Sequence, residues 1–205
     1  MTALFVSAFV TFLLVIDPPG CAPIFAGLTS KASASHRRAM AVRAVLVASA
    51  ILLFFALFGE DLLRALGISL SAFRIAGGLM LFLIAVDMVF EKRTERRENR
   101  AQEVSESEVE DISIFPMAIP MIAGPGSIAS VMLLMARSRG LASDLVVLAA
   151  LAATMVLTLL ALLAAGPLMR LLGRRMEAMI TRLLGVLLAA LAVQFVLDGL
   201  RITFS

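Results

Sequence analysis

Asp17-Pro18-Pro19-Gly20 interrupts an apolar run that extends over residues 4–28. The run is at least long enough to cross a bilayer as a helix. Proline has no N–H donor, and it disfavours helical backbone in the residue before it. We therefore predict a membrane span that is broken here, with Asp17 as N-cap and Pro18 in the first turn of a second half-helix.

An aspartate in the middle of a membrane span indicates a functional site. Lipid tolerates a helix break only where the freed backbone groups face protein or a wet cavity. Inserting an aspartate at the centre of a span into the membrane costs about 2.5–3.5 kcal/mol on insertion scales. Such a residue is therefore expected to have a functional role. One alternative stays open, namely that Asp17 only caps its half-helix; the two roles are compatible.

The composition fits only the membrane class of proteins. Hydrophobic residues make up 61% of the 205 residues, against roughly 45–50% in soluble domains. One cysteine and one histidine do not make a disulfide, a thiol or histidine metal cluster, or a nucleophile–base pair. We therefore expect a lipid bilayer as the surroundings, no metal, no cofactor, no nucleic-acid partner and no enzymatic activity.

Six apolar segments suggest six transmembrane helices, and the basic residues suggest their orientation. Thirteen of the 18 Lys and Arg fall in the first, third and fifth connections, and five fall on the other side. The positive-inside rule places the larger set in the cytoplasm, so both termini are expected on the outer, periplasmic side. The segments are 3–30, 41–58, 72–90, 113–136, 144–166 and 178–200.

A charged stretch divides the chain into two halves. Thirteen of the 21 residues in 91–111 are charged, first mainly basic and then acidic. This composition predicts a solvated, mobile cytoplasmic linker, with a regulatory role left open. We expect residues 1–90 and 112–205 to form two three-helix repeats of one membrane domain.

The two halves resemble each other at a nearly constant offset. Because each predicted repeat has three spans, the second enters the membrane from the opposite face, which gives inverted topology. A duplicated scaffold without transport would show the same pattern. The matched stretches are 62–67 with 168–173, 74–77 with 182–185, and 17–20 with 124–127.

The two helix breaks suggest a binding site for a zwitterion. A half-helix that begins inside the membrane offers free N–H groups and a positive dipole end, which favour a carboxylate. Asp17 at the other break suits an ammonium group or a proton. The residues that we expect to bind substrate are Asp17, Gly20, Gly124, Pro125, Gly126, Ser127 and Gln194, and those that break the helices are Pro18, Pro19, Pro23 and Pro120.

These motifs resemble a known family. Asp17-Pro18-x-Gly20-x-x-Pro23-x-Phe25 looks like the first signature of the MarC family of bacterial inner-membrane proteins, also called the small neutral amino acid transporter family. Pro116-x-Ala118-x-Pro120-x-x-Ala123-Gly124-Pro125-Gly126 is similar to its second signature, and the wider lysine-exporter-like group shares the 3+3 fold. The resemblance implies six spans and neutral amino acid transport. Many members have Asn where this chain has Cys21, so an amide role is not expected there.

We thus predict an all-α, multi-pass inner-membrane protein that transports small neutral amino acids such as alanine, glycine or serine. No nucleotide-binding motif is present, so transport would be passive or coupled to a proton or sodium gradient. The alternatives are a channel or exporter for another small solute or ion, and a scaffold that transports nothing. The sequence leaves open a homo-oligomer and the direction of transport.

Overall fold

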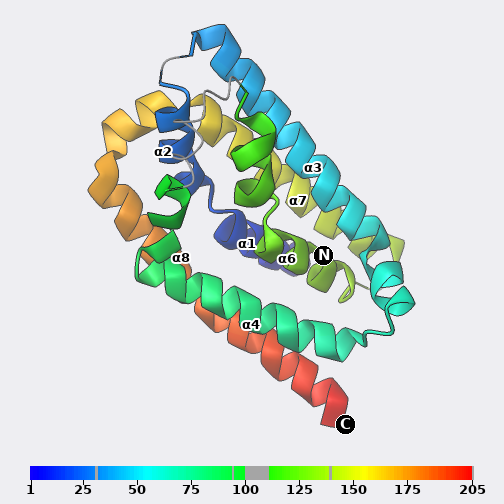
Figure 1. Cartoon of the computed structure of the whole chain (residues 1–205). Helices are drawn as coiled ribbons and strands as arrows, with labels where there is room; N and C mark the ends of the chain where they lie inside the picture. Colours follow the sequence, from blue (N-terminus) through cyan, green and yellow to red (C-terminus); the bar gives the residue numbers. More distant parts are fainter. Residues whose placement is uncertain (31, 94, 100–110, 139, 205) are drawn as a thin grey trace.

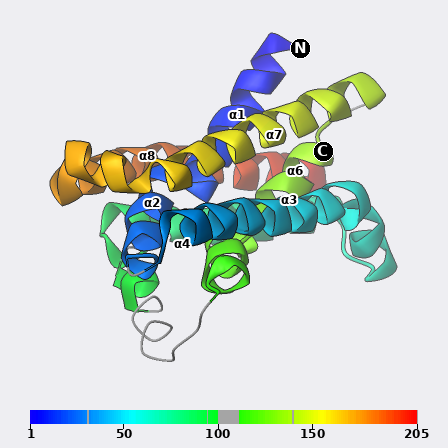
Figure 2. The ribbon, with the colours of Figure 1, turned by 90° about the horizontal axis from the view of Figure 1, so that it is seen from above.

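The computed structural model describes residues 1–30, 32–93, 95–99, 111–138 and 140–204. Figure 1 shows α3 and α7 side by side on one flank, α4 beside the second half of α8 on the other, and α1 and α6 between these pairs. Figure 2 shows the same arrangement from above. The helices are α1 (Thr2–Ile16), α2 (Pro18–Leu28), α3 (Ala34–Ala65), α4 (Leu70–Val89), η1 (Ser113–Ile122), α6 (Pro125–Met135), α7 (Leu141–Leu163) and α8 (Ala165–Phe204).

The first predicted break is present where the prolines place it. α1 ends at Ile16, and Asp17 takes a left-handed backbone conformation, with φ 58° and ψ 65°. α2 begins directly after it with Pro18 and Pro19 in its first positions. The Asp17 carboxylate accepts a hydrogen bond from the Gly20 N–H at 3.1 Å. Asp17 is therefore the N-cap of the second half-helix, as predicted.

The second predicted break is also present. η1 and α6 are bent by 53° at the break that separates them. Gly124 is the N-cap of α6 and Pro125 follows in its first turn. η1 is itself irregular, because Phe115 and Ile119 have extended backbone angles. Both precede a proline, where helical angles are disfavoured.

The predicted all-α membrane fold is confirmed. Five helical stretches of the described residues, with α1 and α2 counted as one, are long and apolar enough to cross a membrane, and η1 with α6 raises the number to six. Many large apolar side chains point outward, including Leu46 on α3 and Leu183 on α8. Apolar surface of this kind is typical of a lipid-facing protein. The inverted symmetry of the halves and the side on which the termini lie stay predictions.

Glycines allow α4 and α8 to pack closely. A Cβ at Gly78 would lie 2.8 Å from the Ala192 carbonyl oxygen, and one at Gly185 would lie 3.1 Å from that of Ala85. Small residues at such contacts let helix backbones approach each other in membranes. This pairing places the end of α4 near the second break.

The buried apolar side chains form two clusters that meet at the end of α1. One cluster contains Phe12 and Ile16 together with residues of α2, α3, η1, α6 and α7. The other contains Leu14 and Val15 together with residues of α4, α6 and α8. The first break therefore lies where both clusters adjoin.

The predicted solvated linker has one buried side chain in its basic half, whereas most of the other described residues there are exposed. Residues 95–99 are helical, and Arg97 is buried against the broken helices. Its charge is matched by a buried carboxylate, so burial does not leave it unpaired. Residues 100–110 of the predicted linker lie outside the described residues, and the boundaries of the two predicted repeats stay a prediction.

Candidate functional site

A pocket of about 280 Å³ opens beside the second break. It lies between the start of α6, the end of η1, the end of α4 and the basic helix. The basic helix is the helical segment after α4, whose described residues are 92–93 and 95–99. Val15, two residues before Asp17, also faces the pocket. The pocket is thus bordered by segments next to both breaks. Its lining residues are Val15, Ile84, Asp87, Arg93, Arg96, Arg97, Pro120, Met121, Gly124, Pro125, Gly126 and Ser127.

The first turn of α6 forms one wall, as the sequence predicts for Gly124, Pro125, Gly126 and Ser127. No side chain caps this helix end, so its N-terminal dipole faces the pocket. A Cβ at Gly126 would lie 2.5 Å from Ile84 Cδ1 and 3.3 Å from Val15 Cγ1. Glycine therefore keeps this wall open.

Two further contacts hold the break in shape. A Cβ at Gly124 would lie 2.4 Å from the Pro120 carbonyl oxygen, so only glycine fits without a backbone shift. The Ser127 hydroxyl donates to the Ile122 carbonyl at 2.7 Å. Ser127 thus ties α6 to η1 across the break.

Three arginines of the basic segment form the opposite wall. Arg96 pairs with Asp87 at 2.5 Å. Arg93 donates to the Val15 carbonyl at 2.7 Å and contacts Met88 Sδ at 3.0 Å. Burial lowers the pKa of Arg93 to about 10, so this side chain stays protonated at neutral pH.

The third arginine forms an ion pair with the acid at the first break. Arg97 Nη1 lies 3.1 Å from Asp17 Oδ2, and both side chains are buried. Arg97 Nη2 also donates to the Met121 carbonyl at 3.4 Å. One side chain of the basic helix therefore contacts both broken helices. Asp17 does not line the pocket, because Arg97 lies between Asp17 and the pocket.

Several predicted residues lie elsewhere. Gln194 is on an exposed part of α8 and donates to Asp198, one turn later, at 2.8 Å; the structure does not bring it to the pocket, because its amide is satisfied within its own helix. Pro23, which was predicted to break a helix, lies inside α2, and this helix continues past it to Leu28. Gly20 abuts the ion pair instead, since a Cβ there would lie 2.2 Å from Asp17 Oδ2.

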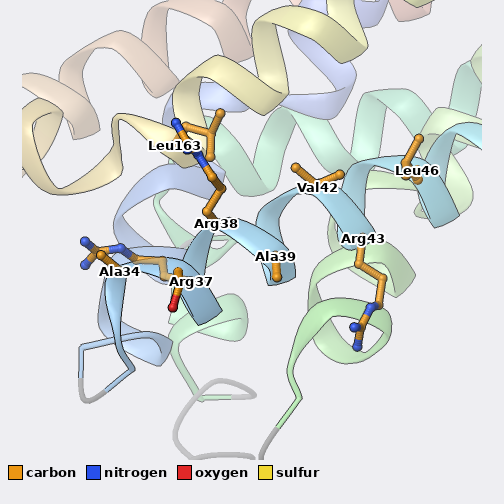
Figure 3. A pocket seen from close by; sticks show the side chains of 9 residues that line it. Ala34, Arg37, Arg38, Ala39, Val42, Arg43, Leu46 and Leu163 are labelled. Atoms are coloured by element: carbon orange, nitrogen blue, oxygen red, sulfur yellow. The ribbon is translucent and has the colours of Figure 1, made fainter.

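A larger hollow of about 930 Å³ lies on the outer face of α3, near the end of α7. Figure 3 shows Arg38 extended toward Leu163 and Arg43 pointing the other way. Arg43 pairs with Asp111. Val42 and Leu46, on the same face, are exposed. This hollow is open to the surroundings and contains no residue of either break, so the smaller pocket is the candidate site.

Comparison with known proteins identifies the family. The family model described as MarC family integral membrane protein matches residues 2–204. The chain belongs to the MarC family. Its relatives include UPF0056 membrane proteins of Methanocaldococcus jannaschii, 38% identical over 96% of both chains, and of Archaeoglobus fulgidus, 36% identical over 96% of this chain and 92% of that one. A third, YvbG of Bacillus subtilis, is 36% identical over 77% and 75%.

The names of these MarC relatives state no activity beyond membrane protein. No solved structure matches the chain. Membership therefore establishes a multi-pass integral membrane protein, and its function must be inferred from the chemistry of the site.

Sequence reasoning missed the arginine wall of this MarC protein. Arg93, Arg96 and Arg97 have i, i+3, i+4 spacing, which places three side chains on one face of a helix. This spacing could have indicated a shared face. It was not used, because a run of mixed charges is usually solvated.

Proposed function

We propose that this protein is a secondary transporter of small neutral amino acids in a bacterial inner membrane. The observation that carries the proposal is the pocket beside the second break, where the start of α6 and three arginines face one another. Segments next to both helix breaks border it. Interrupted helices around a shared pocket are the arrangement that membrane transporters use for substrate sites.

The pocket chemistry favours a carboxylate. The uncapped start of α6 presents the positive end of its dipole. Arg96 and Arg97 are paired with Asp87 and Asp17, whereas Arg93 contacts a carbonyl and a sulfur atom among the described residues. One positive charge is thus left for a ligand, and arginine binds carboxylates well because its donors form a planar fork.

The pocket size favours a small solute. Ligand pockets for drug-sized molecules have volumes of roughly 300–1,000 Å³, and this one measures about 280 Å³. Glycine, alanine and serine suit a pocket of this size and have the required carboxylate. Passive transport, or coupling to a proton or sodium gradient, stays a prediction from the sequence.

The test is uptake of radiolabelled alanine, glycine and serine into proteoliposomes. We expect saturable, stereoselective uptake by the wild-type protein. Gly126→Ala narrows the pocket by meeting the flexible tip of Ile84 and should lower uptake at least about tenfold. Gly27→Ala is the matched control, because a Cβ there meets nothing within 4 Å. Wild-type uptake no greater than that of empty liposomes would refute the proposal.

A second candidate function, a pore or exporter for another small anion, is favoured by the same positive lining. It predicts anion flux that does not saturate and does not discriminate between D- and L-alanine. The same liposomes, loaded with chloride or acetate, distinguish the two candidates.

A further inference from the structure

The buried ion pair joins three segments that are distant in sequence. Arg97 contacts Asp17 at the first break and the Met121 carbonyl next to the second. One turn earlier, Arg93 donates to the Val15 carbonyl at the end of α1. The basic helix therefore contacts both broken helices through buried and partly buried polar contacts, and its arginines line the pocket.

The charges of the pair restrict what can separate it. A carboxylate without an ammonium group could bind Arg97 but would leave Asp17 buried and unpaired. An amine without a carboxylate would leave Arg97 unpaired. A buried charge without a partner is strongly unfavourable. A zwitterion avoids both costs, because its carboxylate can bind Arg97 while its ammonium group binds Asp17.

We propose that an α-amino acid inserts between Asp17 and Arg97, and that this ion pair is therefore both the gate over the pocket and the filter that selects zwitterions. The inference rests on the proposed function and assigns a substrate-binding role to Arg97. Insertion exchanges one ion pair for two. It also detaches the basic helix from the first break, so binding is linked to opening.

The local geometry supports insertion at this point. Arg97 lines the pocket on one side and contacts Asp17 on the other, so a ligand in the pocket can reach the ion pair through Arg97. A Cβ at Gly20 would lie 2.2 Å from Asp17 Oδ2 and 3.1 Å from Arg97 Nη1. Glycine at this position leaves room for the ion pair to pack against α2.

The chain has its own reporter for the gate. Cys21 is the only cysteine in the sequence, and it is fully buried directly after Gly20. Its N–H donates to the Asp17 carbonyl at 3.0 Å. The rate at which a water-soluble maleimide labels Cys21 therefore measures how often this region opens, with Cys21→Ser as the blank.

The first experiment measures labelling of purified protein without substrate. Arg97→Gln should raise the labelling rate at least about tenfold. This corresponds to a decrease of about 1.4 kcal/mol in the free energy of opening. Asp17→Asn/Arg97→Gln should also label faster, and it leaves no unpaired charge that would unfold the protein. Arg97→Lys should restore slow labelling in part, since it keeps the charge. Lys92→Gln, at an exposed position of the same segment, should label like the wild type.

The second experiment measures thermal stabilisation by matched ligands. Glycine and alanine should raise the melting temperature of the wild-type protein by mass action. Acetate, propionate and ethylamine, each at the same concentration, should raise it much less, because each lacks one of the two charges that the separated ion pair needs. Arg97→Gln should lose the preference for zwitterions, whereas Lys92→Gln should keep it. A structural role for Arg97 alone would not change ligand preference.

The outcomes separate this inference from the proposed function. Equal labelling of the wild-type protein and both Arg97→Gln variants would overturn the gate, whatever is transported. Amino acid uptake with equal stabilisation by acetate and glycine would overturn insertion and leave the transporter proposal intact. Absence of uptake would overturn the proposed function, and with it the role of Arg97 in substrate binding.

Discussion

Neutralising one member of the Asp17–Arg97 pair should destabilise the protein more than neutralising both. Asp17 Oδ2 and Arg97 Nη1 are 3.1 Å apart and buried. At an effective dielectric constant of about 20, two unit charges at this distance attract by about 5 kcal/mol. Removing one partner of a buried pair typically costs about 3–5 kcal/mol, because the other charge stays unpaired.

The variants for this test are Asp17→Asn, Arg97→Gln and their combination. Asparagine is as good an N-cap as aspartate, so Asp17→Asn keeps the bond from Gly20 and removes the charge. Each single variant should unfold at a temperature lower by at least about 6 °C, using about 2–4 °C per kcal/mol for a chain of this size. The double variant should lose much less than the sum of the single losses.

The assay is thermal unfolding of the four proteins in one detergent at one scan rate, because unfolding of membrane proteins is often irreversible and then depends on that rate. Lys92→Gln controls for the loss of one positive charge from the same segment. Strictly additive losses, or single variants as stable as the wild type, would show that Asp17 and Arg97 are not energetically coupled and would refute the reasoning.

Three other substitutions have definite expected results. Gly20→Ala should speed maleimide labelling of Cys21, because its Cβ would displace the Asp17 carboxylate; unchanged labelling would contradict this packing. Gly78→Ala should lower the unfolding temperature by the equivalent of about 1–3 kcal/mol, since its Cβ meets a carbonyl of α8. Gln194→Leu should leave alanine uptake unchanged, because Gln194 does not line the pocket and donates to Asp198 within α8; a large loss of uptake would place it in the path.

The helix breaks could be predicted from sequence because their causes are local. Pro18 and Pro125 lack N–H donors and begin helices, while Asp17 and Gly124 are suited to N-cap positions. These rules need no knowledge of the rest of the fold. The same holds for the number of spans, which follows from apolar length.

The Arg97 contact could not be predicted in this way, because it depends on a partner 80 residues distant in sequence. The density of charged residues suggested a solvent-exposed segment. Burial of Arg97 is favourable because Asp17 lies opposite it, and the local sequence does not reveal that contact. Gln194 was misplaced for a related reason. An amide in a membrane span needs a partner, and Asp198, four residues later, satisfies it without a second helix.

Equilibrium binding of radiolabelled alanine to the purified protein decides whether the pocket beside the second break is a substrate site. We expect saturable binding to the wild-type protein and to Gly27→Ala. We expect binding at least about tenfold weaker in Gly126→Leu, whose side chain would fill the pocket next to Ile84 and Val15. Equal binding by Gly126→Leu and Gly27→Ala would show that the substrate site is not at the second break, and no binding to the wild-type protein would contradict the account as a whole.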